Sequence, residues 1–139
     1  MSILLTIHSI NRWLLTLVAL ALIIRLIVGL AKKQSFNKSV TILTGAFGGL
    51  MDLQLLLGAL FLVMDGLAKA GFPSFRWEHA IIMLIAALVA HLPAMWKNKE
   101  DHVRTRNTLI AVIISLLFVF LGMNSLGGWA RWWHIAGLF

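Results

Sequence analysis

Four long apolar runs are the feature of this sequence that most limits its fold. They cover residues 3–31, 40–64, 77–96 and 108–126. A helix of about 20 residues crosses a hydrocarbon layer about 30 Å thick, and each run is close to that length or longer. Backbone amides find no water in that layer, so the chain must satisfy them internally. The sequence therefore predicts an all-α fold, an integral membrane four-helix bundle in one transmembrane domain of residues 1–139.

Composition narrows the range of functions. Hydrophobic residues make up 60% of the chain and charged residues 12%, about half the charged share of a soluble domain. The absence of cysteine excludes disulfides, thiolate metal sites and haem attached through cysteine. We find no paired carboxylates, nucleophile with a base, or phosphate loop, so we expect no independent catalytic activity. The opening MSILLTIHS lacks the basic segment of a cleavable signal peptide.

The loops between the runs predict the orientation. Seven basic residues lie in the first and third loops, and three lie on the opposite side. The seven are Lys32, Lys33, Lys38, Lys97, Lys99, Arg104 and Arg106, and the three are Lys69, Arg76 and Arg131. Loops rich in Lys and Arg stay in the cytoplasm. We therefore expect a bacterial cytoplasmic membrane protein with both termini on the outer side. The net charge of +7 indicates contact with a lipid bilayer and not with nucleic acid.

The segment after the fourth run, residues 127–139, is rich in tryptophan. Indole side chains favour the boundary between membrane and water. We expect this segment to be an interfacial anchor on the outer side, formed by Trp129, Arg131, Trp132, Trp133 and His134.

Polar residues inside the apolar runs need a partner. A charge near mid-bilayer costs roughly 2.5–3.5 kcal/mol on insertion scales. Arg12 and Arg25 lie in the first run, and Asp52 and Gln54 lie near the centre of the second. Each of them therefore needs a structural or functional reason for its place in the membrane.

Asp52 follows a glycine-rich stretch in which Gly45 and Gly49 form a GxxxG pair. At 100° per residue, Asp52 lies within about 60° of these glycines. GxxxG surfaces allow a second helix to approach closely, so we expect Asp52 to face a neighbouring helix. The expected partner is Arg25 or Arg12, in an ion pair that fixes helix register. A proton relay or a cofactor contact is the alternative.

Two histidines occur at similar depth in different runs. His8 lies near the outer end of the first run, and His79 lies a few residues into the third. A b-type haem takes one axial nitrogen from each face, between facing helices. His8 and His79 are therefore candidate ligands of haem iron. Arg12, on the same helix face as His8, and Arg76 are candidates to bind the haem propionates, as are Lys69 and Arg131 on the same outer half. For each histidine the alternative is an amphipathic residue at the membrane interface.

His91 lies twelve residues after His79, about 18 Å along a helix axis. That spacing would suit a second haem, but the two side chains differ by about 120° in direction. Candidate partners for a second haem are His102 and Met51. The alternative is a histidine hydrogen-bonded at a helix end near Arg25, where Pro93 weakens the helix and frees carbonyl groups.

Three short stretches carry a family resemblance: HSINRW at residues 8–13, DLQLLLG at 52–58 and the EH…H pattern at 78–91. On these the chain resembles small four-span bacterial membrane proteins described as cytochrome b-like. The resemblance implies that His8, His79 and His91 are candidate haem ligands. The chain departs from a two-haem pattern because the inner side has no clear second histidine.

Three functions remain open from the sequence. The first is a haem b protein that transfers electrons at the outer membrane face, to a quinone or within a larger redox complex. The second is a cofactor-free accessory subunit of a respiratory or photosynthetic membrane complex. The third is a small proton or solute transporter centred on Asp52, Arg25 and His91, although the chain has no repeat or broken helix pair of the kind many transporters show.

Overall fold

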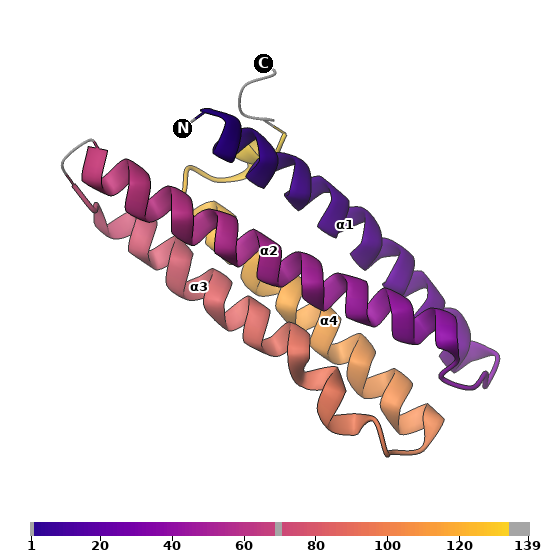
Figure 1. Ribbon diagram of the computed structural model, residues 1–139. Coiled ribbons are helices and arrows are strands. Elements are labelled where there is room, and N and C mark those ends of the chain that lie inside the picture. Colours follow the sequence, from indigo (N-terminus) through magenta and orange to yellow (C-terminus); the bar gives the residue numbers. More distant parts are fainter. Residues whose placement is uncertain (1, 69–70, 134–139) are drawn as a thin grey trace.

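The computed structural model is a bundle of four long helices, and it describes residues 2–68 and 71–133 (Figure 1). Successive helices run in opposite directions and are joined by short loops. Each of α1 and α3 packs against both α2 and α4, so α1 and α3 lie diagonally across the bundle. The helices are α1 (Ser2–Ala31), α2 (Lys38–Ala68), α3 (Ser74–His91) and α4 (Asp101–Asn124), with short 3-10 turns η1 (Leu92–Trp96) and η2 (Trp129–Trp132).

All four helices are long and apolar enough to cross a membrane. The prediction of an all-α bundle of four helices of membrane-spanning length is thereby confirmed. Large apolar side chains also cover the outside of the bundle. Leu17, Ile24, Leu56 and Leu88 are all more than half exposed. Such a surface suits a lipid environment, where exposed apolar side chains meet hydrocarbon instead of water.

The interior combines a few large side chains with small ones. Phe47 and Met51 of α2 are almost fully buried, as are three leucines of α1. Small residues on α3 and α4 let the helices approach closely. One of them, Ser115, donates a hydrogen bond of 2.8 Å to the carbonyl of Ala86 and so ties α4 to α3.

Most helix ends differ from the apolar limits, and at two of them a cap or a proline gives the reason. α2 begins at Lys38, two residues before the predicted run, where the Asn37 side chain accepts a 3.2 Å hydrogen bond from the Val40 amide. α3 ends at His91 and continues as the turn η1, with Pro93 in its first residues. Proline has no amide hydrogen to continue the helix ladder.

The tail after α4 folds back onto the bundle. Trp132 lies beside Trp13 of α1, with ring centres 6.5 Å apart. The guanidinium of Arg12 donates a 2.9 Å hydrogen bond to the Trp132 carbonyl and lies over its indole ring. Trp133 also contacts Trp13. Trp132 and Trp133 therefore pack against the bundle itself. Their predicted role as an anchor at the membrane interface stays a prediction. The side chains of Trp129 and Arg131, and all of His134, fall outside the described residues.

Candidate functional site

His8 and His79 lie at the same end of the bundle, on the diagonal helices α1 and α3. Both side chains are partly buried. The structure thus places at one end of the bundle the two histidines that the sequence paired by depth, and their joint role stays a prediction.

A backbone hydrogen bond fixes the tautomer of His79. Its Nδ1 lies 2.7 Å from the carbonyl oxygen of Gly122 on α4. A carbonyl only accepts, so Nδ1 carries the proton. The lone pair of His79 is then on Nε2. Histidines that bind metals commonly donate their other ring N–H to a carbonyl or carboxylate in this way.

His8 belongs to a chain of polar contacts that joins α1 to α2. Asn11 donates to the Gln54 side-chain oxygen at 2.7 Å and to the Leu50 carbonyl at 3.1 Å. The Gln54 oxygen is therefore an acceptor, and its amide nitrogen donates to His8 Nε2 at 2.9 Å. His8 then carries its proton on Nδ1, which is buried without an acceptor among the described residues.

Glycines of the other two helices lie against both imidazoles. A Cβ added to Gly58 of α2 would lie 3.3 Å from His8 Cε1. A Cβ added to Gly122 of α4 would lie 3.5 Å from His79 Nδ1 and 3.2 Å from the sulfur of Met83. Both helices therefore present bare backbone at the level of the histidines.

Two arginines lie toward this end of the bundle, and both have protein partners. Arg12 is buried and bonds to the Trp132 carbonyl. Arg76 forms an ion pair with Asp65, whose side chain is only 1% exposed, and lies over the ring of Phe61. The binding of haem propionates by these arginines stays a prediction.

His91 and Asp52 form a separate pair on the outside of the bundle. His91 Nε2 lies 2.8 Å from Asp52 Oδ1, and both side chains are more than half exposed. The predicted partner of Asp52, Arg25 or Arg12, was wrong, because Arg25 donates to Ser39 at 3.1 Å instead. His91 is hydrogen-bonded at its helix end, as one alternative held, but its partner is Asp52 and not a group near Arg25.

The glycine-rich stretch of α2 packs differently from the GxxxG prediction. A Cβ at Gly48 would lie 3.3 Å from the His91 ring, whereas Gly45 and Gly49 have nothing within 4 Å of that position. The close approach to α3 therefore occurs at Gly48. The reason is angular: Gly48 and Asp52 are four residues apart and share the face of α2 that meets His91.

Several residues of this site were not found from the sequence. Asn11 and Asp65 are buried, and Gly58 and Gly122 contact the histidines. Asp65 had a usable signal, since a carboxylate in an apolar stretch needs a cationic partner. The two glycines had none, because only the packed structure shows which helix faces each imidazole.

Among the described residues, no group of three or more histidine, aspartate or glutamate side chains could hold a metal ion. No family model, curated protein or solved structure matches the sequence. The fold itself defines the class: a four-helix bundle with helices of membrane-spanning length.

Proposed function

We propose that this protein binds one b-type haem between His8 and His79 and transfers electrons within the membrane. The observation that carries the proposal is the hydrogen bond from His79 Nδ1 to the Gly122 carbonyl. It leaves Nε2 as the unprotonated nitrogen, on a helix diagonally opposite the one that carries His8. Iron binds the unprotonated nitrogen of an imidazole.

Gly58 and Gly122 carry no side chain, which lets the two imidazoles lie against the backbones of α2 and α4. One contact of this arrangement would have to change for a haem to bind. His8 Nε2 is bonded to the Gln54 amide, so His8 would have to give up that bond to bind iron. His8 Nδ1 would then remain the protonated nitrogen, as it is now.

A haem in this position would supply one-electron transfer. With both His8 and His79 as ligands, the group would serve as an electron carrier and not as an oxygen-binding or catalytic centre. Arg12 and Arg76 place positive charge toward the same end, which suits the propionate groups. Asn11 and Gln54 hold α1 and α2 together beside the histidines.

The proposal extends to the orientation of the chain in the membrane and to its partners in electron transfer. The basic loops would lie in the cytoplasm of a bacterium, which puts the two histidines near the outer face. Electrons would pass to a quinone or to a larger redox complex.

The visible spectrum of the protein extracted from membranes tests this function. The proposal predicts a Soret band, with α and β bands on reduction. A colourless protein, purified after expression with an adequate haem supply, would overturn it. Co-purification of that colourless protein with large partners would favour the accessory subunit. A proton flux that Asp52→Asn abolishes would favour the transporter.

A further inference from the structure

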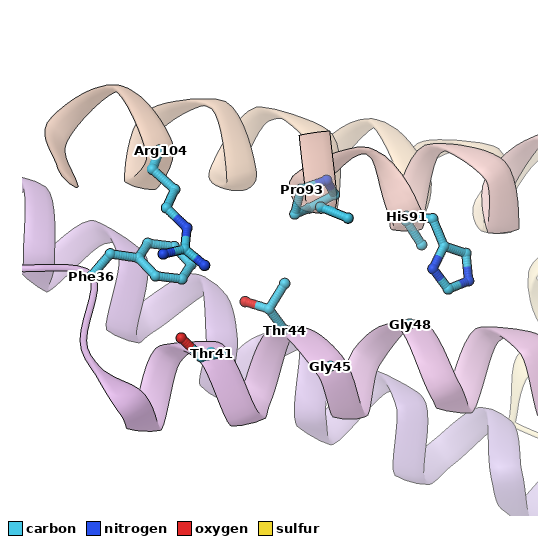
Figure 2. Close-up of a pocket in the computed structure, with 10 residues that line it drawn as sticks. Phe36, Thr41, Thr44, Gly45, Gly48, His91, Pro93 and Arg104 are labelled. Atoms are coloured by element: carbon cyan, nitrogen blue, oxygen red, sulfur yellow. The ribbon is translucent and has the colours of Figure 1, made fainter. Parts of the chain in front are cut away.

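A pocket of about 230 Å³ lies at the other end of the bundle, away from His8 and His79. α2 forms one wall, the end of α3 with η1 forms the other, and α4 closes the end (Figure 2). The pocket exists because Gly45 and Gly48 have no side chains and the helix of α3 ends just before Pro93. Thr41, Gly45 and Ala94 line it and are exposed, so it opens on the outer surface between α2 and η1.

Arg104 of α4 is the cationic group at the basic end of this pocket. Its guanidinium carbon lies 3.8 Å from the ring centre of Phe36, and Figure 2 shows the two side chains stacked at the end of the pocket. Within the described part of the chain, its Nε is buried without an acceptor. Glu100 and Asp101 lie one turn earlier, but neither carboxylate forms an ion pair with it.

An arginine held in this way needs an acceptor. A buried donor without a partner costs about 1–3 kcal/mol, and more when it is charged. The threonines of the pocket do not compete for an anion as donors. Thr41 and Thr44 donate their hydroxyl hydrogens to the carbonyls of Asn37 and Val40. Arg104 is therefore the group that would bind an anion here.

His91 also lines the pocket, with its Nε2 bonded to Asp52 at 2.8 Å, and the rest of the lining is apolar. Gly45 and Gly48 extend from the Arg104 end toward the middle of α2 (Figure 2), and Ala90, Pro93 and Ala94 also line the pocket. A ligand that suits both Arg104 and the apolar lining has an anionic head and a hydrocarbon chain. The neighbouring loops and the adjoining ends of α2 and α4 add charge of the same sign as Arg104, from Lys32, Lys33, Lys38, Lys97, Lys99 and Arg106.

We propose that this pocket binds the phosphate group of an anionic phospholipid, with Arg104 as the main ligand of the phosphate and an acyl chain along the glycine wall. Arginine pairs with phosphate through parallel hydrogen bonds. Basic pockets between membrane helices at the cytoplasmic side are suited to anionic lipid heads. This site is independent of the proposed haem.

Native mass spectrometry of the detergent-purified full chain tests the site, with phosphatidylglycerol and phosphatidylcholine as probes. We expect preferential retention of phosphatidylglycerol. Arg104→Gln should weaken the binding of phosphatidylglycerol about tenfold or more, because the variant loses at least one charge-assisted hydrogen bond to the phosphate. Arg106→Gln is the matched control. It removes the same charge from the same helix, but from an exposed side chain outside the pocket.

A second pair of variants blocks the pocket without changing charge. Gly45→Leu fills open space that lines the pocket, and Gly49→Leu fills open space that does not. We expect Gly45→Leu to lose phosphatidylglycerol and Gly49→Leu to retain it. Equal retention of both lipids, or an equal effect of the two members of either pair, would overturn the proposal. Displacement of bound lipid by millimolar inorganic phosphate would overturn the lipid assignment and identify a site for free phosphate.

Discussion

His79 and His91 lie on one helix, yet they differ in burial and in hydrogen-bond partner. His79 is partly buried and donates to a backbone carbonyl of α4. His91 is exposed and bonds to a carboxylate of α2. The first arrangement leaves an imidazole nitrogen available inside the bundle, whereas the second consumes the Nε2 of His91 at the surface. The chemistry proposed for these two residues differs for this reason.

Among single residues, Gln54 is the one whose replacement should change the stability of the bundle most clearly. Gln54→Leu should lower stability by about 1–2 kcal/mol, because it removes the hydrogen bonds of Gln54 to His8 Nε2 and to Asn11, which keeps the Leu50 carbonyl. Thermal unfolding in detergent measures this. Gln34→Leu, at the other glutamine of the chain, lies in an exposed loop and is the control. Equal melting temperatures for both variants would contradict the account of this polar chain.

The same substitution separates a structural role from a haem-linked one. Because Gln54 competes for His8 Nε2, Gln54→Leu should retain haem, or bind it more tightly, even though the unloaded protein is less stable. A haem titration followed by absorbance measures the affinity. Haem binding that falls together with stability would show that Gln54 supports the site rather than competes for it.

At the scale of the elements, hydropathy was enough to predict four helices but not their ends. Apolar runs mark where hydrocarbon begins, whereas Asn37 and Pro93 decide where α2 starts and α3 stops. Partners between helices were harder to predict. The periodicity gave the direction of Asp52 on α2, but not which helix lay in that direction. Only packing reveals that His91 occupies the place predicted for an arginine.

Glycines on different helix faces should respond differently to added bulk. Gly122→Leu should cost about 1–3 kcal/mol, since even a Cβ there would lie 3.2 Å from Met83 and 3.5 Å from His79. Gly49→Leu should cost nothing, because nothing lies within 4 Å of its Cβ position. Melting temperatures of the two variants give the comparison. A loss at Gly49 as large as that at Gly122 would mean that the exposed face of α2 is packed against something else.

At the scale of the whole molecule, both helical hairpins place their closed ends on one side of the bundle, where the basic loops lie. The proposed haem site and the proposed lipid site are then at opposite ends. Electron exchange would occur near one membrane face, and lipid binding near the other. The orientation of the chain in the membrane is therefore a separate prediction, which can be tested without haem or lipid.

Single-cysteine labelling tests the orientation, because the chain has no native cysteine. Ser35→Cys and Lys99→Cys, in the two basic loops, should resist a membrane-impermeant maleimide in intact cells. Ser74→Cys, at the opposite end of the bundle and exposed, should react. After the cells are broken, all three should react. The reverse pattern in intact cells would place the basic loops outside.

The reduced-minus-oxidised absorption spectrum of three purified proteins tests the central claim most directly: the unaltered chain, His79→Ala and His91→Ala. The account predicts the same haem bands for the unaltered chain and His91→Ala, and none for His79→Ala at equal helical content by circular dichroism. Bands that survive in His79→Ala, or that disappear in His91→Ala alone, would contradict it.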